Sequence, residues 1–188
     1  MVGLCALPAV ILLFSALTGR LGANPVEALT NETGEWGLRF LLVALAATPL
    51  RRLTGSTFLL AHRRAVGLAS FGYVAVHLLV YLALDQSFNW GMVLDDIIGR
   101  PFITFGVAAF VCLLPLALTS WNGAVRRLGP RVWQRLHRLV YVAAVLGVLH
   151  YWLLVKADVR EPMIYAGILA VLLAARVTPP QRSPQPRR

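Results

Sequence analysis

The hydrophobic positions of this chain form long unbroken runs rather than an alternating pattern. Short polar stretches separate six such runs, most of them near the length of about 20 residues that an α-helix needs to cross a membrane. The runs cover residues 2–17, 36–48, 65–84, 101–119, 139–155 and 163–177. The pattern therefore predicts an all-α integral membrane protein, a bundle of about six transmembrane helices.

Two of these runs are less regular than the others. The run 36–48 is short, so we expect it to extend over residues 34–50, with Arg39 reaching toward the membrane surface. Pro49 is expected to end this helix, because proline has no N–H to donate and restricts the residue before it. The run 2–17 has neither a basic start nor a small-residue cleavage site after it, so we expect a true span rather than a signal peptide.

Composition agrees with a membrane protein. Hydrophobic residues make up 58% of the chain and charged residues only 14%, against roughly 25% charged in soluble domains. The net charge is +10, but the basic residues lie between the apolar runs, where they indicate membrane topology. We therefore expect membrane lipid and no nucleic acid as a partner. Cys5 and Cys112 both lie inside apolar runs, which disfavours a disulfide or a thiolate metal site.

The charges divide sharply between the two sides of the predicted bundle. Thirteen basic residues fall on one side with no acidic residue among them: Arg51, Arg52, Arg63, Arg64, Arg126, Arg127, Arg131, Arg135, Arg138, Arg176, Arg182, Arg187 and Arg188. All eight acidic residues fall on the other side: Glu27, Glu32, Glu35, Asp85, Asp95, Asp96, Asp158 and Glu161. By the positive-inside rule, the basic side and both chain termini are predicted to be cytoplasmic.

The chain divides into one membrane domain, residues 1–177, and a short tail, residues 178–188. The tail is rich in proline and arginine, so we expect it to be a disordered cytoplasmic segment. The chain contains no phosphate-binding or dinucleotide fingerprint, no CxxC pair and no HExxH motif. No catalytic substrate site of its own is predicted, and any nucleotide chemistry is expected from a partner.

The candidate chemistry lies in the histidines. His77 lies 12 residues beyond Ala65, about 18 Å along a helix, and His150 lies 13 residues beyond His137, about 20 Å along the next helix of the same direction. Both are therefore expected at one depth, in the outer half of the membrane. Ionisable side chains at such depth are usually functional, and imidazole is a common axial ligand of haem iron. We predict that His77 and His150 bind one haem iron from its two sides.

His62 and His137 form a second matched pair at the cytoplasmic edge. His62 adjoins Arg63 and Arg64, which favours a residue of the membrane interface over a ligand. The 13 residues between His137 and His150 leave a rotation of about 220°, so these two do not share a helix face. His137, with His62, is a candidate for a second, inner haem or for a quinone or flavin entry site. A hydrogen bond to a neighbouring helix is the alternative role for each histidine.

Five stretches, in chain order, are LGANPVEALTNETGEWGLRFLLVALAATPLRR, RRAVGLASFGYVAVHLLVYL, RPFITFG, LALTSWNGAVRRLGPRVWQRLHRLVY and HYWLLVK. Together they resemble the MsrQ (YedZ) family of haem-binding membrane subunits, which belongs to the ferric-reductase-like transmembrane superfamily. The stretches cover most of residues 21–156. In that superfamily a histidine often lies 13 or 14 residues before the position of His77, where this chain has Arg64 and Arg63. The family often has a histidine where this chain has Asn31.

The resemblance implies a function in electron transfer. It implies a haem b subunit of the bacterial inner membrane, with one haem or two, and His77, His137 and His150 as haem-associated residues. The implied partner is a periplasmic molybdopterin-containing reductase, which forms a heterodimer with the subunit and repairs methionine sulfoxide in oxidised periplasmic proteins. The implied electron donor is the quinone pool or a cytosolic flavin reductase, and FMN is an associated cofactor.

Two other functions remain open on the sequence. The first is a cytochrome b-type ferric reductase component that works without this partner, which would need a flavin and nicotinamide module. The second is a membrane scaffold or transporter whose histidines only join helices.

Overall fold

The protein is built from helices joined by short connections. The computed structural model describes residues 2–177, and within that range it contains no β-strand. The predicted tail, residues 178–188, lies outside the described residues. In chain order the elements are α1 (Val2–Leu17), α2 (Pro25–Thr54), α3 (Phe58–Val80), the π-helical turn η1 (Tyr81–Asp85), α4 (Trp90–Gly99), α5 (Pro101–Leu118), α6 (Asn122–Leu128), α7 (Pro130–Leu136), α8 (Leu139–Leu154) and α9 (Arg160–Val177). The all-α prediction is confirmed.

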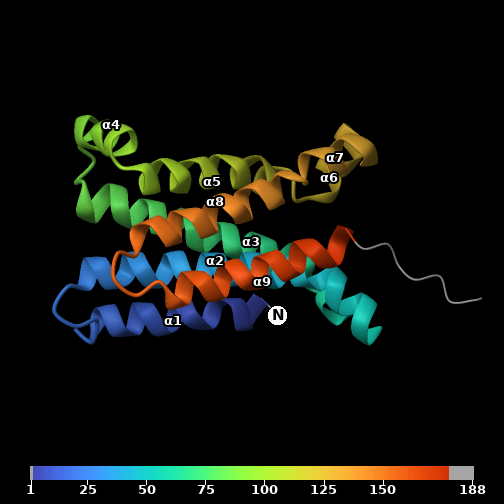
Figure 1. Ribbon diagram of the computed structural model, residues 1–188, viewed down its shortest axis with the longest axis horizontal. Coiled ribbons are helices and arrows are strands. Elements are labelled where there is room, and N and C mark those ends of the chain that lie inside the picture. Colours follow the sequence, from blue (N-terminus) through green and yellow to red (C-terminus); the bar gives the residue numbers. More distant parts are fainter. Residues whose placement is uncertain (1, 178–188) are drawn as a thin grey trace, which may run out of the picture.

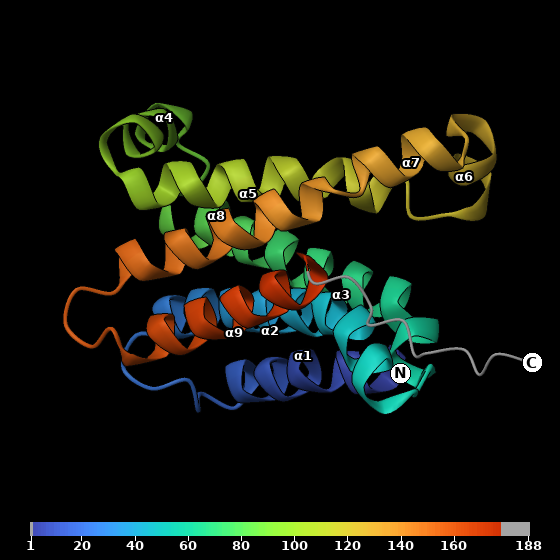
Figure 2. The ribbon, with the colours of Figure 1, turned by 45° about the vertical axis from the view of Figure 1, so that its right-hand side comes forward.

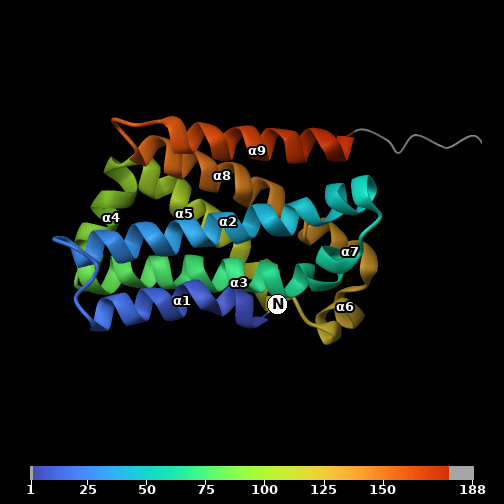
Figure 3. The same cartoon turned by 90° about the horizontal axis from the view of Figure 1, so that it is seen from below.

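The long helices lie alongside one another and form the body of the molecule. Helices α1, α2, α3, α5, α8 and α9 each have 16 residues or more and share one long axis (Figures 1 and 2). Among them, α1 and α9 lie on opposite edges (Figure 3). The short helix α4 lies at one end of the bundle, and α6 and α7 lie at the other (Figure 1).

Among the described residues, three helical segments are long and apolar enough to cross a membrane: Phe58–Asp85, Pro101–Leu118 and Pro130–Leu154. A shorter apolar helix covers Gly3–Leu17. Large apolar side chains project from the outside of these helices, with Leu79 55%, Val111 58% and Leu118 66% exposed. A soluble protein rarely exposes contiguous apolar surface of this extent, whereas a bilayer accepts it. The chain is therefore an all-α membrane protein.

Helix α2 is much longer than the apolar run that predicted it. It begins at Pro25, where the Asn24 side chain accepts a hydrogen bond from the Glu27 N–H and proline occupies the first helical position. The prediction missed these first turns because glutamates interrupt the apolar pattern before residue 36. The added turns carry Thr30 and Asn31, which line a cavity between the helices.

Pro49 does not end α2, so that prediction is wrong. The helix continues to Thr54 and stops at Gly55, whose φ of 74° is the left-handed conformation that glycine adopts readily. Proline at position 49 deprives the Leu45 carbonyl of its helical donor. Arg176 of α9 supplies a replacement, because its Nη2 donates to the Leu45 carbonyl at 2.7 Å. Its Nη1 donates to the Tyr141 hydroxyl at 2.6 Å.

Other boundaries also differ from expectation. Helix α3 begins at Phe58, so His62, Arg63 and Arg64 lie in its first two turns rather than in a loop. Helices α4, α6 and α7 occupy stretches that were expected to be loops. These helices are 7 to 10 residues long and lie at the ends of the bundle, so they carry no apolar run long enough to mark them in the sequence.

Helices α2 and α3 pack closely because small residues lie between them. The Ser70 hydroxyl, which is fully buried, donates to the Gly37 carbonyl at 2.7 Å. A Cβ at Gly37 would lie 2.7 Å from Val74 Cγ2, so no larger residue fits there without a shift. Small residues at helix interfaces, with hydroxyls bonded across them, are typical of membrane bundles.

We expect Arg176→Ala to lower the free energy of unfolding by about 1–3 kcal/mol, because the Leu45 carbonyl then loses its replacement donor. In a Pro49→Ala background the same change should destabilise less, since alanine at position 49 restores the helical N–H donor. Thermal unfolding in detergent measures both effects, with exposed Arg131→Ala on α7 as the control. An equal loss in the two backgrounds would contradict this role for Arg176.

Candidate functional site

A cavity of about 320 Å³ lies between α2, α3, α5 and α8, toward the α4 end of the bundle. Its size is within the usual range for ligand sites, about 300–1,000 Å³. Apolar side chains form most of its wall, among them Leu38, Val107 and Phe110. His77 and His150 both line it. The cavity therefore combines an apolar interior with a small number of polar groups.

His77 is held by the backbone of α2. It lies on α3, three residues before the last residue of that helix. Its Nδ1 is 2.8 Å from the carbonyl oxygen of Thr30. A carbonyl only accepts hydrogen bonds, so Nδ1 carries the proton and Nε2 keeps its lone pair.

His150 is held in the same way by the backbone of α5. It lies on α8, four residues before the last residue of that helix. Its Nδ1 is 2.6 Å from the carbonyl oxygen of Phe102. The same argument assigns the proton to Nδ1 and leaves Nε2 as the free nitrogen.

The two imidazoles lie close to each other in the cavity. Their ring centroids are 5.9 Å apart and their planes are inclined at 81°. An imidazole nitrogen binds a transition metal at about 2 Å, so two rings on opposite sides of one ion have centroids about 6 Å apart. Within residues 2–177, no group of three or more His, Cys, Asp or Glu side chains is placed to hold a metal ion. The pair fits a metal that brings its other ligands with it, as haem iron does.

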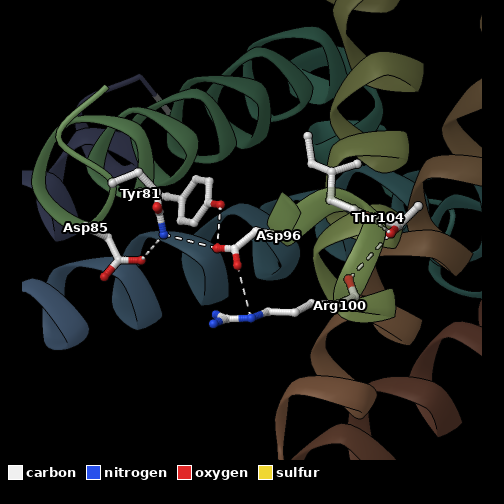
Figure 4. Close-up of polar contacts among 7 residues, drawn as sticks. Tyr81, Asp85, Asp96, Arg100 and Thr104 are labelled. Atoms are coloured by element: carbon white, nitrogen blue, oxygen red, sulfur yellow. Dashed lines mark hydrogen bonds and ion pairs between the residues drawn. The ribbon is translucent and has the colours of Figure 1, made fainter. Parts of the chain in front are cut away.

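A polar cluster lies where the cavity approaches the α4 end (Figure 4). Asp96 of α4 is its centre, because its carboxylate accepts from the Tyr81 hydroxyl at 3.0 Å and from Gln86 Nε2 at 3.0 Å. Arg100 Nε lies 3.1 Å from the other oxygen of Asp96. Tyr81, Asp85 and Arg100 also line the cavity, so this cluster shapes the α4 end of the cavity.

A second cavity, of about 730 Å³, lies toward the α7 end of the bundle. His137 lines it at the junction of α7 and α8. The His137 ring stacks on the Trp133 ring with centroids 3.8 Å apart, and its Nε2 lies 3.1 Å from the Thr119 hydroxyl. Trp133 is itself held, because its Nε1 donates to the Thr119 carbonyl at 2.9 Å.

Guanidinium groups surround this second cavity. Arg63 and Arg64 of α3, Arg138 before α8 and Arg176 of α9 all line it. Arginine binds carboxylate and phosphate groups through paired N–H donors, so such a cavity suits an anionic ligand. His137, the candidate for an inner site, therefore lies in a cavity whose arginines suit an anionic ligand.

His62 lies outside both cavities. Its Nδ1 is 2.8 Å from the carbonyl of Phe58 on its own helix, and its ring packs on the Phe58 ring with centroids 4.7 Å apart. The structure thus brings His77 and His150 together, but it does not bring His62 to His137. This placement matches the interfacial role that the neighbouring arginines favour.

The two cavities adjoin along the bundle axis. Leu41 of α2 and Leu113 of α5 line both of them. Phe71, which lines the second cavity, stacks on Phe110, which lines the first, with ring centroids 5.7 Å apart. The boundary between the two cavities is therefore apolar.

Sequence reasoning missed two residues that touch the histidines, Gly34 and Gly106. One signal could have found them. His77 follows Gly34 by 43 residues, and His150 follows Gly106 by 44. Nearly the same glycine-to-histidine spacing thus occurs twice in the chain.

Comparison with known proteins agrees with this geometry. A family model described as ferric reductase like transmembrane component matches residues 33–148. A protein of Rhodospirillum rubrum, named protein-methionine-sulfoxide reductase heme-binding subunit MsrQ, is 58% identical over 178 residues. The match covers 95% of this chain and 86% of that protein. This chain belongs to the MsrQ family.

Two further MsrQ proteins carry the same name. The one from Caulobacter vibrioides is 51% identical over 92% of this chain and 82% of its own length. The one from Xanthomonas euvesicatoria is 54% identical over 84% of this chain and 72% of its own length. The MsrQ resemblance stated from the five sequence stretches is therefore confirmed.

We expect Asp96→Ala to destabilise the protein by about 1–3 kcal/mol, because it removes the acceptor of Tyr81 and one of the two acceptors of the buried Gln86 amide. Asp95→Ala is the matched control, since Asp95 is the adjacent acidic residue and is exposed. Thermal unfolding in detergent compares the two. Equal stability of the two variants would show that the cluster does not hold the α4 end in place.

Proposed function

We propose that this protein is a haem b electron-transfer subunit of the bacterial inner membrane. In this proposal it passes electrons from the quinone pool or a cytosolic flavin reductase to a periplasmic molybdopterin methionine-sulfoxide reductase, its heterodimer partner, for repair of oxidised periplasmic proteins. The observation that carries the proposal is the pair of imidazoles 5.9 Å apart in one cavity, each with its Nδ1 already bonded. The names of the MsrQ relatives, which say heme-binding subunit, support the same cofactor.

In the cavity near α4, here called the outer cavity, His77 and His150 would hold the haem through their Nε2 atoms. A bound haem b would supply reversible one-electron transfer. The chain's own contribution is to fix both rings through the Thr30 and Phe102 carbonyls and to keep water away with an apolar wall. Axial ligation and burial together tune the reduction potential.

The end of the outer cavity near α4 is the proposed exit for electrons. Glu35, Asp85 and Arg100 line the cavity there, and the acidic residues of the chain gather at this end. The partner would dock on this surface, close to the histidine pair. No substrate pocket for a sulfoxide is proposed within this chain, because the reduction itself belongs to the partner.

The second cavity, near α7 and here called the inner cavity, is the proposed entry for electrons. His137 with the surrounding arginines would serve a second haem or a quinone or flavin site, and the guanidinium groups suit haem carboxylates or the phosphate of FMN. Leu41 and Leu113 line both this cavity and the outer one. The arrangement supports a route that runs along the bundle from one cavity to the other.

The proposed topology has six spans with both termini in the cytoplasm. Six helices of 16 residues or more share one axis, although only three of the described helical segments combine the length and the hydropathy of a typical span. Helices α2 and α9 are more polar because charged residues lie within them, such as Glu35 and Arg39 in α2. Glu35 and Arg39 form an ion pair with each other, which reduces their cost at the membrane interface.

Purified wild-type protein, supplied with haem, should show a reduced b-type absorbance spectrum. His77→Ala and His150→Ala should each abolish that spectrum, because each removes one of the two residues that would hold the haem. His62→Ala should retain it, since His62 lies outside both cavities. Absence of haem from folded wild-type protein would contradict the proposal and favour a scaffold or transporter.

The haem-to-chain ratio identifies the ligand of the inner cavity. If a haem binds there, His137→Ala should lower the ratio while the outer spectrum remains. If a quinone or flavin binds there, the ratio should stay constant while reduction of the outer haem by a quinol or reduced flavin slows. A variant that changes neither quantity would remove His137 from the proposed route.

Single cysteines, introduced after Cys5 and Cys112 are replaced by alanine, test the six-span topology. Ser56→Cys lies in the connection between α2 and α3, and Ala157→Cys lies between α8 and α9. In inverted and right-side-out membrane vesicles, a membrane-impermeant thiol reagent should label the first from the cytoplasmic side and the second from the periplasmic side. Labelling of both from one side would contradict the topology.

A further inference from the structure

We propose that Gly34 and Gly106 are positioning residues for the histidine pair. Each lacks a side chain at the point where an imidazole lies against the neighbouring helix, and so lets that ring reach a backbone carbonyl one turn away. The inference rests on the proposed function for the identity of the ligand, a haem iron. The contact between glycine and ring is a feature of the structure itself.

The seat of His77 is formed by Thr30 and Gly34 of α2. His77 Nδ1 lies 2.8 Å from the Thr30 carbonyl oxygen. A Cβ built on Gly34 would lie 2.9 Å from the same Nδ1 and 3.1 Å from Cε1 of the ring. A methyl group at Gly34 would therefore displace the imidazole from the position in which it makes this hydrogen bond.

The seat of His150 is formed by Phe102 and Gly106 of α5. His150 Nδ1 lies 2.6 Å from the Phe102 carbonyl oxygen. A Cβ built on Gly106 would lie 2.8 Å from Nδ1, 3.0 Å from Cε1 and 3.3 Å from Cγ. The crowding is as severe as at Gly34.

Helix geometry explains why glycine occupies this position in both seats. In an α-helix the carbonyl of one residue accepts from the N–H four residues later, and these two residues lie on one face, one above the other. Thr30 and Gly34 have this separation, as do Phe102 and Gly106. A side chain on the later residue would cover the second lone pair of the carbonyl. Glycine leaves that lone pair open to the imidazole.

The hydrogen bond has a direct effect on ligand chemistry. Donation from Nδ1 fixes the tautomer, orients the ring and raises the basicity of Nε2, as such outer contacts do for metal-bound histidines. Without this hydrogen bond the imidazole could rotate, and its Nε2 would turn away from the cavity. Gly34 and Gly106 would thus act on the iron through His77 and His150, without touching it.

The experiment compares glycine-to-alanine variants of the full chain, purified in detergent with haem supplied. Gly34→Ala and Gly106→Ala should each weaken haem retention by about ten-fold or more and shift the low-spin ferric EPR signal and the midpoint potential of the remaining haem. Gly72→Ala is the matched control. Gly72 lies on α3, and a Cβ there would meet nothing within 4 Å, so this variant should behave as wild type.

A double-mutant cycle separates the seat from general packing and needs no haem. In haem-free protein, Gly34→Ala should lower the melting temperature when His77 is present. In a His77→Ala background it should not, because the ring that the new methyl group meets is gone. The cycle also covers the case in which the single variant folds poorly.

The outcomes are distinguishable. Wild-type haem retention and EPR signal in both glycine variants would overturn the inference, as would an equal loss of melting temperature in the two backgrounds. Absence of haem from wild-type protein would overturn the proposed function and with it the ligand role of the seats. The haem-free cycle would then still decide whether the glycines position the rings.

Discussion

Donation from side chains to backbone carbonyls of neighbouring helices is the interaction on which this bundle depends. A bilayer offers no water to a carbonyl or to a polar side chain, so each must find a partner within the protein. Ser70 donates to Gly37, Arg176 to Leu45, His77 to Thr30 and His150 to Phe102. Each of these bonds joins two different helices, so the same bonds that satisfy polar groups also fix helix packing.

The histidine site is built from two similar halves. Helices α2 and α3 form one half and α5 and α8 the other, each with a carbonyl and a glycine on the first helix and a histidine on the second. In each half the first helix runs away from the α4 end and the second returns to it (Figure 1). The two halves therefore resemble an internal repeat. Its rotation axis would lie along the membrane normal, as it does in some transporter folds. Two equivalent histidine positions follow from such a repeat.

The two ends of the bundle differ in chemistry, and the two cavities reflect that difference. Near α7 the cavity is large and lined by arginines, which suits anionic groups. Near α4 the cavity is smaller and mostly apolar, and the Asp96 cluster lies at its end. The arginines mark the side that the positive-inside rule assigns to the cytoplasm. The same charges therefore serve as a topology signal and as the lining of a site.

The sequence by itself determined the all-α class, the positions of most apolar helices and the equal depth of His77 and His150. Hydropathy and helical rise are local properties, so they can be read without tertiary contacts. The sequence could not reveal that α2 passes through Pro49, because the replacement donor, Arg176, lies on a distant helix. The sequence favoured an interfacial position for His62 but still paired it with His137, and it could not identify Gly34 and Gly106 as contacts of the imidazoles. Those features depend on which helix faces meet, and only the tertiary structure decided that.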